Sequence, residues 1–373
     1  MADSPASDIK PKAYRPHIVD EWQLAPAIWD EVRHRVDDDS ANKGQWILTG
    51  SSTPLNENRP NHSGAGRIGR IRMNPLTLYE SGLSTGAVSL SGLFEHKLAA
   101  AKSEISTQML LDAVCRGGWP EAVALPVSDA QILIREYMRL TLTESVPRQG
   151  KDPDVARRLL DSFARNISQA VTFKTLRKDM YGTEENLDDF ISERTVSGYT
   201  AMFENMFVID PIKGWVPPAR DPKRLQTKAR RYFADPSIAA AMLGMSPAAL
   251  IGDWQTFGFL FENLCIRDLL VYARSLLDIG IEPVRYYRDD SGLECDAIIE
   301  LSDGRWGGIE IKSSEDKVPE ASANLCRLKD KLLRNPSART REPEFLAVLV
   351  GVGEFAYQRD DGVYVIPVGV LGA

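Results

Sequence analysis

The chain has 373 residues, of which 43% are hydrophobic and 26% charged, and its formal net charge is -7. This length exceeds one ordinary core of about 100 to 200 residues, so it predicts two or three domains, and the composition excludes a disordered, collagen-like or coiled-coil chain. The negative charge argues against a wholly basic nucleic-acid coat. There is no run of about 18 apolar residues and no apolar leader, so we expect a cytoplasmic protein without a membrane partner. Four cysteines without a CxxC pair favour reduced thiols over a zinc site.

The first elements of the chain predict a strand, a helix and a second strand. Residues 17–21 run from apolar side chains into two acids, residues 27–33 are amphipathic, and residues 45–49 are strand-like before the small polar cluster 50–53. At this spacing the pattern is typical of an α/β unit. The polar, Gly-rich residues 54–70 are expected to form a loop.

The candidate nucleotide-binding residues lie in this first unit. His17-Ile18-Val19-Asp20-Glu21 looks like a Walker B strand, in which Asp20 would hold the magnesium of a nucleoside triphosphate and Glu21 would polarise the attacking water. Residues 46–52 resemble the sensor strand of AAA-type ATPases, which would bring Thr49 or Ser51 near the γ-phosphate. Arg67 follows Gly66 where such proteins place an arginine that reaches a phosphate.

The middle of the chain is predicted to be mainly helical. Residues 83–154 are expected to form a lid-like helical region, interrupted at 117–120 and at Pro147. Between about 155 and 215, three short helices and a small hairpin outline a winged helix-turn-helix, with residues 192–206 as its recognition helix. DNA contact and a packing or interaction role are both open for this module.

A basic cluster follows the predicted winged helix. Its six cations fall within twelve residues that contain one acid, and they are Arg220, Lys223, Arg224, Lys228, Arg230 and Arg231. Such a cluster suits contact with the phosphates of nucleic acid, whereas a solvated loop with surface ion pairs is the alternative.

The last third carries the sharpest chemical signal. A long apolar helix over 257–276 contains Glu262, Asp296 lies near the start of a later strand, and Glu310 and Lys312 lie on the next strand. Because side chains two apart share one face of a strand, a hairpin can bring Asp296 beside Glu310 and Lys312. Carboxylates so placed suit Mg²⁺ or Mn²⁺, and the lysine suits a hydrolytic water or a phosphate. A cross-strand surface ion pair is the alternative.

This arrangement resembles the PD-(D/E)xK restriction-endonuclease-like fold, where a helix acid, a hairpin Asp and an ExK strand form the metal site. The wider set of motifs is similar to that of a large prokaryotic family that joins an AAA-type ATPase domain to such a C-terminal domain of unknown function. The motifs, in order, are Val19-Asp20-Glu21-Trp22-Gln23, Leu48-Thr49-Gly50-Ser51-Ser52, Gly66-Arg67, Asn74-Pro75-Leu76-Thr77-Leu78-Tyr79-Glu80, Gly117-Gly118-Trp119-Pro120-Glu121-Ala122, Arg231-Tyr232-Phe233-Ala234-Asp235 and the ExK segment.

The resemblance implies an α/β and α+β multidomain chain with four parts. These are a partial P-loop-type AAA α/β domain over 1–82, a helical region over 83–154, a winged-helix region with a basic linker over 155–250, and a restriction-endonuclease-like α/β domain over 251–373. It further implies ATP and Mg²⁺ as cofactors of a complete chain, nucleic acid as a partner, and assembly into a homo-oligomer.

One family feature is absent from the sequence. No GxxxxGK[ST] phosphate loop occurs, although its amides and lysine cradle the phosphates in members of this family. The loss of the loop and a start of the gene further upstream are both open. In either case we expect this chain alone not to hydrolyse ATP, because that cradle supplies much of the electrostatic stabilisation. An incomplete sheet is also expected to expose apolar surface.

Three functions therefore compete. The first is an AAA-type ATPase relative with a nuclease-like C-terminal domain that acts on or near nucleic acid. The second is a non-catalytic nucleic-acid-binding or protein-interaction module whose sites are vestigial. The third is a metal-dependent nuclease that works through the C-terminal carboxylates and Lys312.

Overall fold

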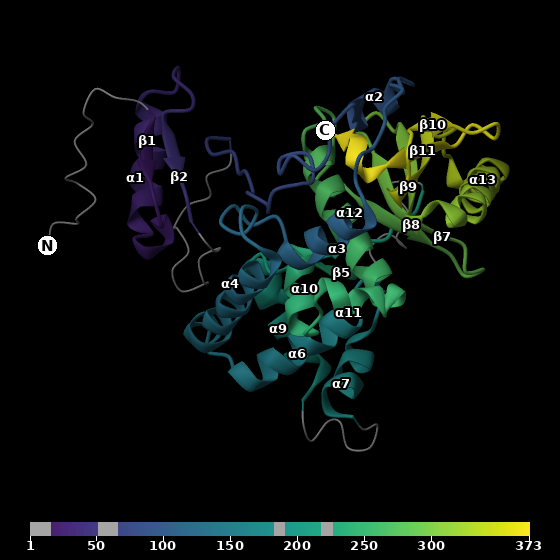
Figure 1. The fold of residues 1–373 in the computed structure, drawn as a ribbon. Coiled ribbons are helices and arrows are strands. Elements are labelled where there is room, and N and C mark those ends of the chain that lie inside the picture. Colours follow the sequence, from purple (N-terminus) through teal and green to yellow (C-terminus); the bar gives the residue numbers. More distant parts are fainter. Residues whose placement is uncertain (1–15, 51–65, 183–190, 218–226) are drawn as a thin grey trace, which may run out of the picture. The chain divides into compact units, whose positions relative to one another are not determined.

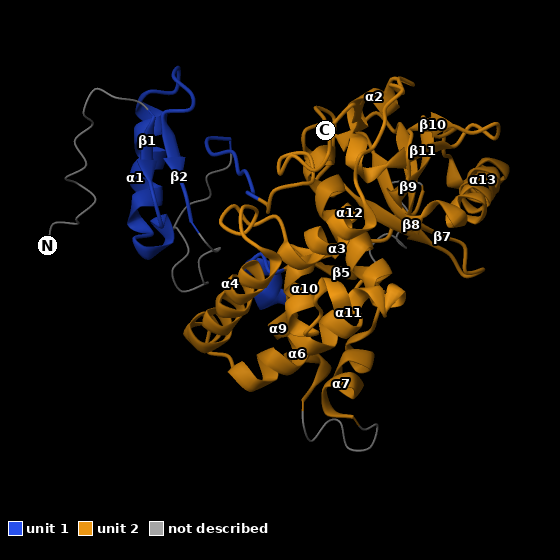
Figure 2. Cartoon of the chain, viewed as in Figure 1, with its two compact units in different colours: residues 1–73, 201–208 blue, residues 74–200, 209–373 orange. Residues whose placement is uncertain are grey.

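The computed structural model describes residues 16–50, 66–182, 191–217 and 227–373. The chain divides into two compact units, one of residues 1–73 with 201–208 and one of residues 74–200 with 209–373 (Figure 2). A mixed α/β chain of several parts, as expected from the sequence, is confirmed.

The first unit contains a strand, a helix and a parallel strand. β1 (His17–Val19) leads through a short 3-10 turn into α1 (Ala27–Asp38), and β2 (Trp46–Leu48) pairs with β1 in parallel. α1 buries two apolar side chains, Trp29 and Val32, one turn apart, which holds it against the strands. Ile18 and its neighbour across the ladder, Ile47, remain 67% and 44% exposed. The strand, helix and strand expected from the sequence are therefore present, and apolar side chains of the strands are exposed.

The second unit is mainly helical in its first half and has one further helix, α13, within the sheet region. Its helices are α2 (Leu90–Phe94), α3 (Thr107–Arg116), α4 (Val127–Leu140) with a π turn (Thr141–Ser145), α5 (Val146–Arg148), α6 (Pro153–Arg165), α7 (Phe173–Tyr181), α9 (Glu193–Asn205, which crosses the boundary between the units), α10 (Pro236–Met242), α11 (Pro247–Ile251), α12 (Trp254–Arg274) and α13 (Val318–Arg334). Their starts follow the sequence signals, since Ser106, Asp152 and Asp253 each accept a main-chain hydrogen bond at a helix N-terminus. No described helix is long and apolar enough to span a membrane.

A six-stranded sheet forms the second half of this unit (Figure 1). Its strands, in spatial order, are β10 (Tyr357–Gln358), β11 (Tyr364–Pro367), β9 (Phe345–Val352), β8 (Trp306–Ser314), β7 (Glu294–Glu300) and β6 (Arg285–Arg288). β6, β7 and β8 run antiparallel, whereas β8 and β9 are parallel and are connected through α13. Parallel neighbours need such a crossover, because no tight turn can join them.

Two smaller strand pairs also lie among the described residues of this unit. β4 (Ile209–Ile212) pairs antiparallel with β5 (Arg230–Phe233), and β3 (Val88–Ser89) pairs in parallel with β12 (Leu371–Gly372) near the end of the chain. α6, α7 and α9 are the three helices that the sequence indicated, but β4 pairs with β5 at 230–233 and not with a strand inside the predicted range of about 155–215. Their interpretation as a winged helix stays a prediction.

The core of the sheet region lies between α13 and the strands. Leu325, Leu328 and Leu332 recur along one side of α13 and are at most 5% exposed, in one cluster with Val348 and Val350 of β9. Burying a side chain of this size stabilises the fold by about 1.5–3 kcal/mol. This packing fixes β8, the central strand that carries Glu310 and Lys312.

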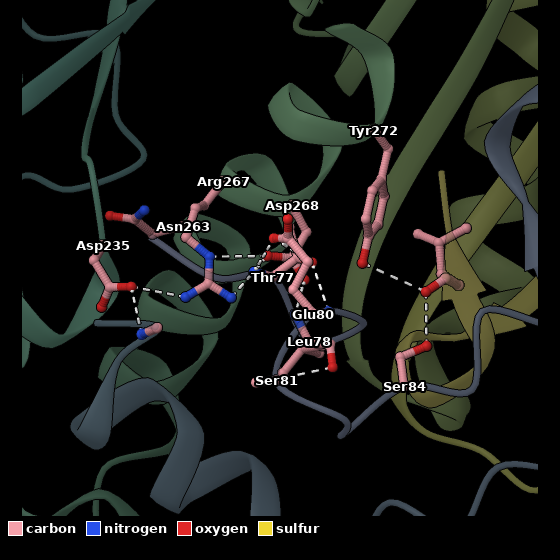
Figure 3. Close-up of polar contacts among 12 residues, drawn as sticks. Thr77, Leu78, Glu80, Ser81, Ser84, Asp235, Asn263, Arg267, Asp268 and Tyr272 are labelled. Carbon is pink, nitrogen blue, oxygen red and sulfur yellow. Dashed lines mark hydrogen bonds and ion pairs between the residues drawn. The ribbon is translucent and has the colours of Figure 1, made fainter. Parts of the chain in front are cut away.

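A network of buried ion pairs anchors α12 to its neighbours (Figure 3). Arg267 of α12 donates from Nη1 to Asp235 Oδ2 over 2.7 Å and from Nε to Asp268 Oδ1 over 2.8 Å. Both carboxylates also accept main-chain bonds of 2.9 Å, Asp235 from Gly118 and Asp268 from Leu78. All three charged side chains are at most 5% exposed. These bonds therefore replace the interactions with water that each charge lost on folding.

The consecutive glycines 117 and 118 are required by this network. Gly117 ends α3 at φ 76°, a conformation that favours glycine. A Cβ on Gly118 would lie 2.0 Å from the carbonyl oxygen of Leu76, whose own N–H donates to the Gly118 carbonyl. Only glycine lets these two chain segments approach so closely.

Candidate functional site

Six charged side chains meet beside β7 and β8, and we call them the charged cluster. They come from three parts of the second unit: β5 supplies one, α12 one, and the neighbouring strands β7 and β8 the rest. The six residues are Arg230, Glu262, Glu294, Asp296, Glu310 and Lys312. The structure thus brings together the four C-terminal residues singled out in the sequence, namely Glu262, Asp296, Glu310 and Lys312.

Asp296 is fixed by the main chain of the adjacent strand. Its Oδ2 accepts a 2.9 Å hydrogen bond from the N–H of Ile311, the residue between Glu310 and Lys312. Lys312 Nζ lies 2.7 Å from Glu310 Oε2 and 3.8 Å from Asp296 Oδ2. The sequence reasoning that a hairpin brings these three side chains together therefore describes their actual placement.

Arg230 lies among the carboxylates. Its Nη1 is 3.4 Å from Asp296 Oδ1 and 3.6 Å from Glu262 Oε1, and its Nη2 pairs with Glu294. The ring of Tyr286 lies 4.6 Å from the guanidinium carbon. Only 5% of the Arg230 side chain is exposed, so its charge is compensated inside the protein and is not presented to solvent.

Strand β5 is attached to α12 by uncharged groups as well. Tyr232 donates from its hydroxyl to Glu262 Oε1 over 2.6 Å. Asn263 accepts from the N–H of Phe233 and donates to its carbonyl oxygen, at 3.0 and 2.8 Å. These bonds hold Arg230 and Glu262 in register with each other.

The environment shifts the protonation of two carboxyl groups. Burial raises the pKa of Glu310 to about 8, and repulsion from Asp296 adds to the shift. Burial and the same neighbour raise the pKa of Glu262 to about 8. For Lys312, burial lowers the pKa, but Asp296 and Glu310 outweigh this and raise it, so the ammonium stays charged. Glu310 and Glu262 therefore release their protons at a higher pH than ordinary glutamates do.

The cluster does not fit a divalent metal as it is arranged. Among the residues that the structure describes, no group of three or more His, Cys, Asp or Glu side chains is placed to hold a metal ion. Glu262, Asp296 and Glu310, the expected ligands, are engaged by Arg230 and Lys312 instead. No step through Mg²⁺ or Mn²⁺ follows from this arrangement.

The nucleotide candidates lie at the ends of the two strands of the first unit. Asp20 directly follows β1, Thr49 directly follows β2, and the Thr49 hydroxyl donates to Asp20 Oδ1. Glu21 has φ 50° and accepts a hydrogen bond from Gln23. Asp20 and Thr49 thus form one group of oxygen atoms, the donor type that Mg²⁺ prefers.

Two other nucleotide candidates are placed differently. Arg67 pairs with Asp37 near the C-terminal end of α1. Ser51 lies outside the described residues. The structure therefore brings Asp20 and Thr49 together and gives Arg67 an acidic partner.

The basic cluster divides into separate environments. Arg220, Lys223 and Arg224 lie outside the described residues. Lys228 is exposed, whereas Arg231 is partly buried with its guanidinium 5.0 Å from the ring of Phe173. Arg230 belongs to the charged cluster, so it is not available to contact a phosphate at the surface.

Comparison with protein families assigns the first part of the chain. Residues 6–82 match an AAA domain. We call this match the AAA segment; it contains Asp20, Glu21, Thr49 and Arg67, and the AAA family uses ATP and Mg²⁺ generally. Residues 107–249 match a domain of unknown function, DUF8612, and residues 257–371 match another, DUF4143. No curated protein and no solved structure matches the chain.

These boundaries show that the charged cluster is shared. Arg230 belongs to the DUF8612 segment, and the other five members belong to the DUF4143 segment. Sequence reasoning assigned Arg230 to phosphate contact and missed Tyr232 and Glu294. The alternation of Arg230 and Tyr232 before Asp235 is a signal for a strand with one polar face, but nothing local indicates that this face meets α12.

Proposed function

We propose that this protein is an AAA-type ATPase-family protein that handles Mg²⁺-nucleotide through Asp20 and Thr49. The family match over the AAA segment supports this, and so does the Thr49 hydrogen bond to Asp20 at the ends of two parallel strands. When bound, Mg²⁺ would neutralise phosphate charge. Asp20 would orient the metal-bound nucleotide, and Thr49 would keep the Asp20 carboxylate in place. Glu21 and Arg67 are the proposed water-polarising and phosphate-contacting residues.

We further propose that the DUF4143 segment is a nuclease-like body, linked to nucleic acid, that does not cleave in the form described. One observation carries this proposal: Glu262, Asp296, Glu310 and Lys312 converge from a helix and two adjacent strands. The order of antiparallel β6, β7 and β8 followed by α13 and parallel β9 supports the same interpretation. No cleavage step is proposed, because Arg230 and Lys312 already pair with these carboxylates.

Nucleotide handling is tested by titrating a fluorescent ATP analogue with Mg²⁺. Because the 373 residues contain no GxxxxGK[ST], we expect weak binding without hydrolysis, and tighter binding by a version extended upstream to any encoded phosphate loop. Asp20→Ala should abolish the binding, whereas Asp30→Ala, in α1 of the same unit, should not. Unchanged binding of the ATP analogue by Asp20→Ala would refute the proposed role of Asp20.

A metal-dependent nuclease is the second candidate, favoured by the position of Lys312 between Glu310 and Asp296. Its test is cleavage of DNA in Mg²⁺ or Mn²⁺. Cleavage that disappears in both Asp296→Ala and Lys312→Ala would establish it in place of the non-cleaving body. Absence of cleavage by the unaltered chain is the result that our proposal expects.

A further inference from the structure

The guanidinium of Arg230 lies where the carboxylates of the charged cluster point toward one another. It is within 3.4 and 3.6 Å of Asp296 and Glu262, and it also pairs with Glu294. The side chains of Glu262 and Asp296 are only 16% and 13% exposed. Carboxylates so shielded from water need a cation nearby, and Arg230 provides it.

The position of Arg230 is set from several directions. Its backbone is in the β4–β5 ladder opposite Ile212, and the Tyr286 ring lies over its guanidinium. The hydroxyl of Tyr286 donates to the carbonyl oxygen of Lys228, two residues earlier, which fixes the ring relative to β5. The side chain therefore has one well-determined place, in contact with the acids.

A guanidinium and a divalent cation compete for the same oxygens. The planar Arg fork serves several carboxylates at once, as it does for Asp296, Glu262 and Glu294. Mg²⁺ requires oxygen ligands at about 2.0–2.1 Å with near-octahedral geometry. A fixed positive charge among the acids opposes entry of a second cation both by occupying the oxygens and by repulsion.

We propose that Arg230 is the resident cation of the charged cluster and that, by occupying oxygens of Glu262 and Asp296, it keeps divalent metal ions from binding among Glu262, Asp296 and Glu310. This inference rests on the nuclease-like interpretation of the DUF4143 segment and specifies how its site is kept from binding metal. The DUF8612 segment thereby supplies, through β5, the residue that decides whether the acids of the DUF4143 segment can hold a metal.

The test is a Mn²⁺ titration of the full chain followed by electron paramagnetic resonance, which counts free Mn²⁺ and needs no activity. We expect Arg230→Met to bind one Mn²⁺ at least about tenfold more tightly than the unaltered chain, and Arg230→Lys to bind it no better. Adding Asp296→Asn to Arg230→Met should abolish the gain. Arg288→Met is the matched control, since Arg288 pairs with Glu294 at 3.1 Å but is 54% exposed and should leave binding unchanged.

Each other outcome has one meaning. Tight Mn²⁺ binding by the unaltered chain that is lost in Asp296→Asn would overturn the role of Arg230 and leave the nuclease-like interpretation intact. Absence of binding by both the unaltered chain and a folded Arg230→Met would overturn both, because the acids would then not be metal ligands. If Arg230→Met does not fold, as judged by circular dichroism, Arg230→Met with Glu294→Gln removes the cation together with one acid and is scored in the same way.

Discussion

The main-chain N–H of Ile311 and the carboxylate of Asp296 are joined by a 2.9 Å hydrogen bond just beyond the last paired residues of the β7–β8 ladder, Ala297 and Ile309. A side chain of one strand is thus attached to the backbone of the next. With this oxygen bound, the other oxygen of Asp296 lies 3.4 Å from Arg230, and Lys312 Nζ lies 3.8 Å from the bound one. This contact sets the position of Asp296 within the charged cluster.

The raised pKa of Glu310 makes stability depend on pH. Between its ordinary value of 4.5 and about 8, the folded protein retains a proton that the unfolded chain releases. The contribution of Glu310 to the free energy of unfolding therefore falls as pH rises through this range. We expect Glu310→Gln, which keeps a neutral acceptor for Lys312, to flatten the pH dependence measured by denaturant unfolding. Glu342→Gln, at an exposed position, should retain the slope of the unaltered chain, and an unchanged slope in Glu310→Gln would contradict the shift.

Arg267 should be among the residues whose loss destabilises the second unit most. Its replacement by Met leaves Asp235 and Asp268 buried without their cation, which costs about 3–5 kcal/mol in comparable cases. Denaturant midpoints measure the change. The control is Arg139→Ala on α4. Arg139 and its partner Glu136 are both exposed to solvent, so this substitution should change the free energy of unfolding by less than about 0.5 kcal/mol. Similar midpoints for the two variants would count against the network.

Gly118 and Gly258 should respond in opposite directions to alanine. A Cβ at Gly118 would meet backbone atoms of Leu76, so Gly118→Ala must displace the segment that connects to Asp268. A Cβ at Gly258, within α12, meets nothing within 4 Å, and there the better helix propensity of alanine should stabilise by about 0.5–1 kcal/mol. Thermal unfolding of both variants provides the comparison. Stabilisation by Gly118→Ala would refute the close approach.

Asn263 should be needed to hold β5 against α12. Replacing it with Ala leaves the buried N–H and carbonyl of Phe233 without the partner they have now, at a cost of about 1–3 kcal/mol for each unsatisfied group. We expect a lower denaturant midpoint for Asn263→Ala. Faster hydrogen exchange at Phe233 would locate the effect, and unchanged exchange there would contradict it.

Several features were predictable from the sequence because they depend on local chemistry. Period-two spacing placed Glu310 and Lys312 together, and the apolar run into Asp20 predicted the strand that pairs with the one ending before Thr49. The helix expected over 192–206 is likewise present, as α9 (Glu193–Asn205).

The parts that escaped prediction depend on contacts between distant segments. Arg230 lies 32 residues before Glu262 and 66 before Asp296, and a run of cations in sequence does not reveal that one of them points inward. Asp235, Arg267 and Asp268 also form their network through tertiary contacts. Charged residues are rarely buried, so composition favours a surface position until the partners are known.

In our proposal Arg230, and not a metal ion, is the cation that Glu262 and Asp296 share. A crystal of the full chain soaked in MnCl₂ and measured at a wavelength where manganese scatters anomalously tests it most directly. We expect no anomalous peak among Glu262, Asp296 and Glu310, with the Arg230 guanidinium between Asp296 and Glu262. A manganese peak coordinated by Asp296 and Glu310, with Arg230 displaced or still in place, would contradict it.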